Sequence, residues 1–146
     1  MKTFPIAALI LLLMTGCTPM YTTHFLLQSP STSAHVNPDI DAILTEVDTT
    51  AAEFKYQNEL ITQESANDGW LRNYWLRDPG YPRQGVAHAL LALQHNNTID
   101  IAVRDIPATT QSPLSARLRR SLEERLIKRF GKNSLRTAEK VEHGPL

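Results

Sequence analysis

The feature that most constrains this chain is a short apolar run near its start, which ends beside the only cysteine of the sequence. Residues 4–14 are all apolar and follow a single positive charge at Lys2. The run is about eleven residues long, whereas a helix that spans a bilayer needs roughly 20 apolar residues. A short apolar run behind a basic start is the layout of a cleaved secretory signal.

The residues that follow the run favour lipid attachment. Thr15 and Gly16 are small, so the chain can lie extended in a peptidase groove, and the thiol of Cys17 can form a thioether. Cys17 has no disulfide partner within the chain, because it is the sole cysteine. Met14-Thr15-Gly16-Cys17 resembles the lipobox of bacterial lipoproteins, with Met14 where leucine is commonest.

This resemblance implies a type II signal peptide over residues 1–16, which is cleaved between Gly16 and Cys17. It also implies a diacylglyceryl group and an N-acyl chain on Cys17, which would anchor the protein to a membrane rather than span it. Thr18, in place of Asp after the cysteine, implies sorting to the outer membrane with the domain facing the periplasm. The inner membrane and the cell surface stay open as alternatives.

The sequence predicts a lipidated flexible tether over residues 17–36. Residues 29–33 consist of Ser, Pro and Thr, which cannot build a core. A flexible tether of this length has a reach of roughly 25 Å. Tyr21 and Phe25-Leu26-Leu27 form an apolar patch within it, which either lies among lipid headgroups or adds an edge strand to the domain.

Two segments predict amphipathic helices. Residues 38–56 carry apolar residues at spacings of three and four, and Asn37 is the expected N-cap. Residues 113–130 follow the capping residue Ser112 and stop at Gly131. The second helix has an apolar ridge that recurs every four residues: Leu114, Leu118, Leu122, Leu126 and Phe130.

The remaining segments are less uniform in their signals. Residues 99–103 alternate between apolar and other side chains and predict a half-buried strand. Residues 70–77 fit a strand or a helix equally well, and residues 82–95 favour a helix over a hairpin strand. The tail, 133–146, predicts one short strand or a frayed end.

These elements predict a small α+β domain over residues 37–146, with two or three helices packed on a few-stranded sheet. Its charge is uneven: residues 17–66 hold seven acids and one lysine, whereas residues 67–146 hold thirteen basic residues and eight acids. The two halves most simply attract each other within one fold. A basic face directed at an anionic partner is the alternative.

No catalytic motif is recognisable, and the five histidines lack the spacing of metal ligands. The sequence therefore predicts no metal, no cofactor beyond the lipid on Cys17, and no enzymatic activity, although an unrecognised hydrolase stays open as a third reading. Nucleic acid is not an expected partner of a protein that faces the periplasm.

The leading functional hypothesis is a non-catalytic accessory or scaffolding lipoprotein that docks onto another envelope protein, of the kind that serves a secretion, conjugation or assembly apparatus. The alternative is a module that binds peptidoglycan or another glycan. Interleaved aromatic and basic side chains can form such surfaces. The candidate binding surface consists of Trp70, Trp75, Arg117, Arg119 and Arg120.

Overall fold

Six antiparallel strands form one sheet in the computed structural model of the chain, which describes residues 18–28, 39–77 and 87–144. The strands follow the spatial order β2-β3-β4-β5-β1-β6. Their bounds are β1 (Thr18–Gln28), β2 (Gln57–Asn58), β3 (Trp70–Arg77), β4 (Ala87–His95), β5 (Thr98–Ile106) and β6 (Leu135–Gly144).

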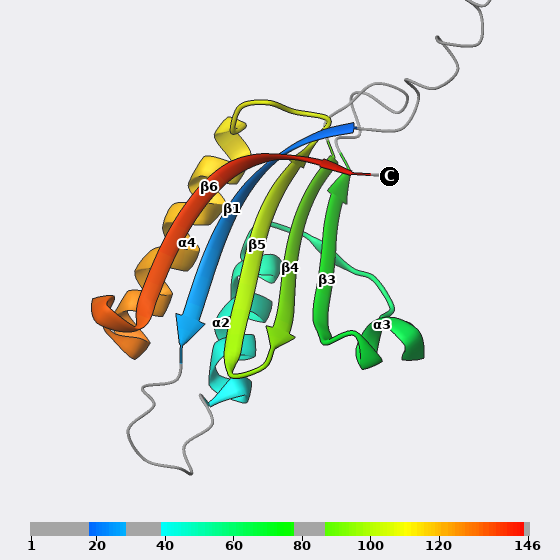
Figure 1. Ribbon diagram of the computed structural model, residues 1–146. Coiled ribbons are helices and arrows are strands. Elements are labelled where there is room, and N and C mark those ends of the chain that lie inside the picture. The colour runs from blue at the N-terminus through cyan, green and yellow to red at the C-terminus, as the bar shows by residue number, and fades with distance from the viewer. Residues whose placement is uncertain (1–17, 29–38, 78–86, 145–146) are drawn as a thin grey trace, which may run out of the picture.

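Two long helices, α2 (Ile40–Glu53) and α4 (Pro113–Phe130), lie side by side on one face of the sheet, behind it in Figure 1. A short helix, α3 (Gln63–Asn67), lies next to β3, and a 3-10 turn, η1 (Lys132–Ser134), links α4 to β6. This arrangement confirms the predicted α+β class: a small single domain with three helices and an antiparallel sheet.

The main core fills the space between the two long helices and the sheet. Leu118, Leu122 and Leu126 of α4 are fully buried there, while Leu114 and Phe130 at the two ends of the ridge are half-buried. The predicted ridge is confirmed. Other fully buried side chains of this core come from α2 and three strands: Ile43, Val47, Phe25, Leu90, Ile99, Ile101 and Val103.

The ends of α4 lie where the capping signals predict them. The side chain of Ser112 accepts a hydrogen bond from the backbone N–H of Ser115, and Gly131 ends the helix with a φ of 83°. For α2, the predicted cap is wrong. Asp39 caps this helix by accepting a hydrogen bond from the backbone N–H of Ala42, and Asn37 lies outside the described residues.

The tether prediction is wrong for residues 18–28. These residues form β1, which pairs with β5 on one side and β6 on the other. Phe25 and Leu27 are buried beneath the helices, so the apolar patch belongs to the interior of the sheet rather than to an edge strand. The buried threonines Thr22 and Thr23 suit a strand as well, because β-branched side chains pack on a pleated surface. The folded domain therefore includes Thr18–Gln28, which the prediction places in the tether.

The helix favoured over residues 82–95 is also wrong where the structure describes it. Ala87–His95 is strand β4, which forms a hairpin with β5 across a turn at Asn96, where φ is 54°. The run from His88 to Ala92 is buried throughout. In a strand that is buried on both faces, apolar and polar residues no longer alternate. The apolar residues of such a strand can then match a helical period by chance.

The two other segments for which the sequence left alternatives, residues 70–77 and the tail, both form strands. Residues 70–77 form β3, so of their two readings the strand is the correct one. The tail forms β6, a ten-residue strand, and the predicted strand at 99–103 is confirmed within the longer β5.

Acidic α2 and basic α4 face each other through ion pairs. Arg125 lies 2.9 Å from Glu53, and Arg129 lies 2.8 Å from Glu46. These pairs support the interpretation that the acidic and basic halves of the chain attract each other within the fold. Their contribution to stability is small, since exposed ion pairs contribute about 0–1 kcal/mol each.

We expect Phe25→Ala to lower the free energy of unfolding by about 3–5 kcal/mol, because it removes a fully buried aromatic ring. Chemical denaturation measures this loss. Leu26→Ala is the matched control on the same strand, since Leu26 points to the other face and is half-buried. Equal losses for the two variants would contradict the assignment of residues 18–28 to the sheet.

Candidate functional site

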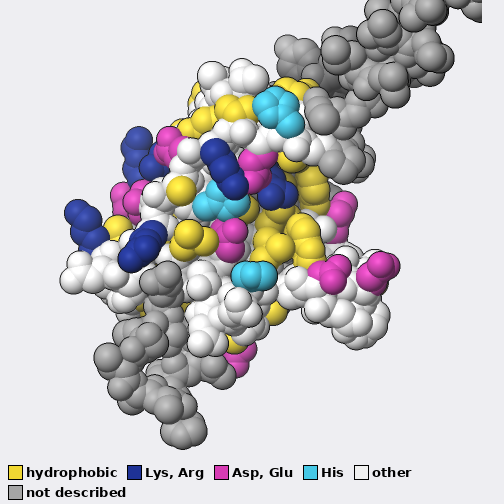
Figure 2. Space-filling model, viewed as in Figure 1, with side chains coloured by type: hydrophobic (Ala, Val, Ile, Leu, Met, Phe, Trp, Pro, Cys, Tyr) yellow, Lys and Arg dark blue, Asp and Glu magenta, His cyan; other side chains and the backbone are white. Residues whose placement is uncertain are grey.

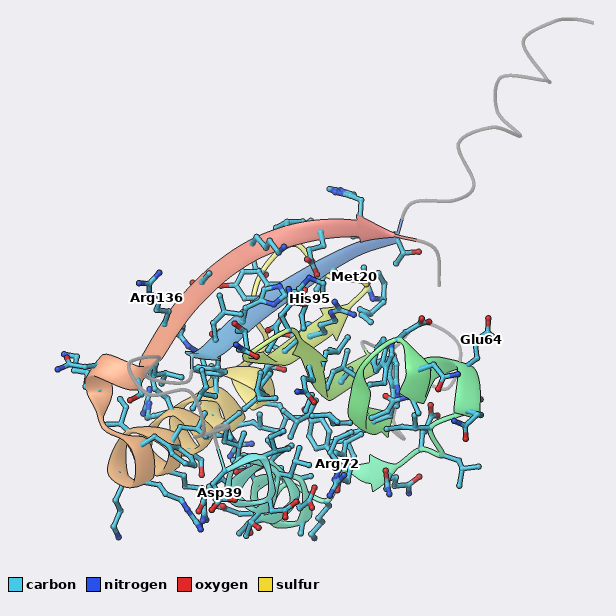
Figure 3. All side chains as sticks on the ribbon, turned by 60° about the horizontal axis from the view of Figure 1, so that its bottom comes forward. Met20, Asp39, Glu64, Arg72, His95 and Arg136 are labelled. Carbon is cyan, nitrogen blue, oxygen red and sulfur yellow. The ribbon has the colours of Figure 1, made fainter. Side chains whose placement is uncertain are left out.

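The two faces of the sheet have different surroundings. Side chains alternate between the faces of a strand, and one set packs against α2 and α4. Within residues 18–28, 39–77 and 87–144, no helix covers the other set (Figure 1). We call this second side of the sheet the open face. Figure 3 shows Met20 and His95 on it, on the opposite side of the sheet from α2.

One half of the open face is an apolar strip over β3 and β4, which Figure 2 shows as a continuous yellow area. Trp75 pairs with Ala89 across these strands, and Trp70 pairs with Leu93. Both tryptophans and Leu93 are half-buried, while the alanines beneath them are not exposed at all. We define the apolar strip by its members: Trp70 and Trp75 of β3, Ala89, Leu91 and Leu93 of β4, and Ala102 of the neighbouring strand β5.

The other half of the open face is a polar cluster over β1, β5 and β6. His24 Nδ1 lies 3.0 Å from both carboxylate oxygens of Asp100, and His24 Nε2 lies 3.4 Å from Glu142. Glu142 also contacts Arg104 at 3.3 Å and Lys140 at 2.7 Å. The cluster therefore joins three neighbouring strands through charged groups.

Glu142 is the centre of the polar cluster. Burial of this carboxyl favours its neutral form, but hydrogen bonds from Lys140 and Thr22 and the charge of Arg104 outweigh that effect. Together they lower the pKa of Glu142 to about 2. The cluster holds two carboxylates, of Asp100 and Glu142, and two basic side chains, of Arg104 and Lys140, so opposite charges are equal in number.

A second polar group lies on the helix side, where Asp105 is fully buried. Its carboxylate accepts hydrogen bonds from the backbone N–H and hydroxyl of Ser112, from the hydroxyl of Ser115 and from His88 Nδ1. Burial alone would raise the pKa of Asp105, but these hydrogen bonds hold the pKa below its ordinary value. Asp105 thus fastens the start of α4 to β4 and β5.

The residue types of this buried group match a hydrolase triad, but its geometry differs. In a triad the serine hydroxyl bonds to Nε2 of the histidine, and the carboxylate bonds to Nδ1. Here the Ser115 hydroxyl donates to Asp105 and lies 3.5 Å from Nδ1 of His88. All three side chains are less than a tenth exposed. The arrangement holds the start of α4 in place through Asp105.

The structure does not bring the predicted surface residues together. Trp70 and Trp75 lie on the open face, whereas the three arginines lie on α4, on the other side of the sheet. Arg119 pairs with Glu139 of β6. Arg117 and Arg120 are exposed on α4. The five residues therefore form no single surface.

Sequence reasoning missed the polar cluster, because His24, Asp100 and Glu142 are far apart along the chain. Only the pairing of β1 with β5 and β6 brings them onto one face. Cys17, the predicted lipid site, lies outside the described residues, and β1 begins at the next position.

Within the described part of the chain, no group of three or more His, Cys, Asp or Glu side chains is arranged to hold a metal ion. No helix among the same residues is long and apolar enough to cross a membrane. The sequence matches no protein family model and no curated protein.

We expect Glu142→Gln to weaken the dependence of the protein's stability on pH below about pH 4.5. The folded state lowers the pKa of Glu142 from 4.5 to about 2, so its contribution to stability is complete above pH 4.5 and disappears as the pH falls to about 2. The difference in Tm between the native protein and this variant should therefore shrink across that range. Glu64→Gln, at an exposed position on α3, serves as the control. A difference that does not change with pH would contradict the expectation.

Proposed function

We propose that this chain is a membrane-anchored lipoprotein of the bacterial envelope, attached through lipid on Cys17, and that its domain docks onto another envelope protein without catalysing a reaction. The observation that carries the docking part is the apolar strip on the open face. The anchoring part rests on the lipobox resemblance and on the position of β1.

β1 begins one residue after Cys17, so a lipid on this cysteine would be attached directly next to the sheet. One residue spans at most about 3.6 Å, so lipid on Cys17 would hold Thr18 close to the headgroups. Thr18 pairs with Gly144 at one end of the sheet. That end would then lie near the membrane surface, rather than at the end of a tether with a reach of roughly 25 Å.

The apolar strip supports a protein partner. Tryptophan is enriched in protein interfaces and at the positions that contribute most to binding. Trp70, Trp75 and Leu93 are half-buried, so they retain surface that a partner can cover. The occupant we propose is an envelope protein that presents apolar side chains to this strip.

The polar cluster argues against an anionic ligand on the open face. Arg104 and Lys140 are both in ion pairs with Glu142, and His24 faces Asp100. A phosphate or carboxylate ligand would have to displace these partners. The glycan-binding alternative has less support than protein docking, since the exposed arginines of α4 lie on the side away from the tryptophans.

For the anchor, we expect Cys17→Ser to leave the fold intact and to abolish both palmitate labelling and fractionation with membranes. The substitution removes the thiol but no part of the described sheet. Metabolic labelling and membrane flotation measure the two effects. A variant that still floats with outer membranes and still labels would contradict lipid attachment at Cys17.

For the docking face, we expect Trp75→Ser to release a stoichiometric envelope protein that copurifies with the full chain from solubilised membranes. The matched control is Leu60→Ser, because Leu60 is 94 % exposed and is not part of the strip. Thermal melting checks that both variants fold. Copurification that is unchanged by Trp75→Ser, or absent from the native protein, would contradict docking through the strip. Trp75-dependent retention on purified peptidoglycan would instead support the glycan alternative.

A further inference from the structure

Strand β6 is a long free edge of the sheet. Among the strands that the structure describes, it is last in the order and pairs with β1 alone. The pairing runs from Thr18 opposite Gly144 to Leu27 opposite Leu135 without a register shift. No strand among the described residues takes up its outer side. Such an edge presents a row of backbone N–H and C=O groups that can pair with another strand.

The opposite edge of the sheet is protected. There, β2 contributes two residues beside β3, and the backbone N–H of Glu59 donates to the carbonyl of Asn73 at 2.8 Å. Natural sheets often shorten or cover their edges in this way. β6 has no such cover from the described residues, and it contains neither proline nor a bulge.

The side chains of β6 alternate between the two faces. Lys140 and Glu142 lie on the open face, where Glu142 accepts a hydrogen bond from Thr22. Glu139 lies on the helix side, where Tyr21 donates to it. Val141 shares the face of Glu139 and is exposed, at 41 %, which only one other large apolar side chain in the described ranges exceeds.

We propose that β6 pairs antiparallel with β6 of a second copy of this chain, with Val141 on the two-fold axis. Side chains that are directly opposite share a face and interact. In this register Lys140 of each copy faces Glu142 of the other, and Glu139 faces His143. Val141 faces Val141. The strand is therefore complementary to itself in charge and buries an exposed apolar side chain.

Neighbouring registers lack this complementarity. A two-fold axis at Lys140 sets that lysine against itself, and an axis at Glu139 sets that glutamate against itself. An axis at Ala138 sets Arg136 against Lys140. Like charges directly opposite each other are destabilising, so among these four registers the charge pattern favours Val141 as the centre. The two six-stranded sheets would join into one, with both open faces on the same side.

This pairing leaves the apolar strip free, since the strip lies over β3 and β4 and the contact is at the other end of the sheet. The proposal also does not depend on lipid attachment. A failure of the dimer and a failure of the docking function can therefore be told apart.

A disulfide at the two-fold axis tests the contact. We expect Val141→Cys in the full chain to form a covalent dimer under mild oxidation, read on a non-reducing gel. Opposite Cα atoms of an antiparallel pair lie about 4.5–5.5 Å apart, which suits a disulfide. Thr137→Cys is the matched control, being exposed on the same face of the same strand. In the proposed register its two copies lie roughly 27 Å apart.

A covalent dimer with Val141→Cys alone supports the proposal. No dimer with either variant, or equal amounts with both, overturns it. A crosslink from position 141 to a protein of another size also overturns self-pairing and assigns the edge to a different partner. Cys17 is common to both variants, so any dimer that it forms appears in the control as well.

Charge reversal tests the register. We expect Lys140→Glu, combined with Val141→Cys, to lower the dimer yield by roughly tenfold, because two attractive pairs become repulsive. Adding Glu142→Lys to the same chain should restore the yield. Coexpressed single variants Lys140→Glu and Glu142→Lys with different tags should form mixed dimers in preference to dimers of either alone. Thermal melting checks the fold of each. Dimer yields that are the same in all these charge variants would overturn the proposed register.

Discussion

The pairing of β1 with both β5 and β6 is the constraint on which the rest of this structure depends. β1 brings the start and the end of the described chain together, since Thr18 lies opposite Gly144. Without it, β6 has no neighbour in the sheet, and the polar cluster loses His24 and Thr22. The burial of Phe25 and Leu27 beneath the helices fixes this strand, because a shift by one residue would turn both side chains to the open face.

The two faces of the sheet follow from this placement and differ in how they are stabilised. On the helix side, apolar burial dominates, at roughly 1.5–3 kcal/mol for each large side chain that is fully buried. The buried acid Asp105 on that side is compensated by hydrogen bonds from His88 of β4 and from Ser112 and Ser115 at the start of α4. On the open face, a smaller apolar strip and a balanced group of charges share the surface. Stability therefore comes mainly from one face, which leaves the other available for contacts with a partner.

The sequence predicts the parts of this fold that local chemistry determines. α4 is correct at both ends, because Ser112, Pro113 and Gly131 act within one turn of their own positions. The hairpin strand β4 is missed because it is buried on both faces, so its apolar residues do not alternate with polar ones. The segments that bury it are distant in the sequence. β1 is missed for a related reason: its threonines are polar along the chain but lie in a sheet interior. The polar cluster depends on strand register, which no local pattern encodes.

The open face combines its two halves in a way that suits a protein partner. A partner that lies across the face would gain from covering Trp75 and Leu93, since aromatic and aliphatic surface contributes most to docking. It would also cross the polar cluster, where Glu142 is already bound to Arg104 and Lys140. Covering charges that are paired costs less than covering isolated ones. The more exposed Lys140, at 56 %, lies near the edge strand, where a polar rim of an interface remains in contact with water. In the docking that we propose, the pairing within the cluster would lower the cost of covering its charges, and the apolar strip would supply the attraction.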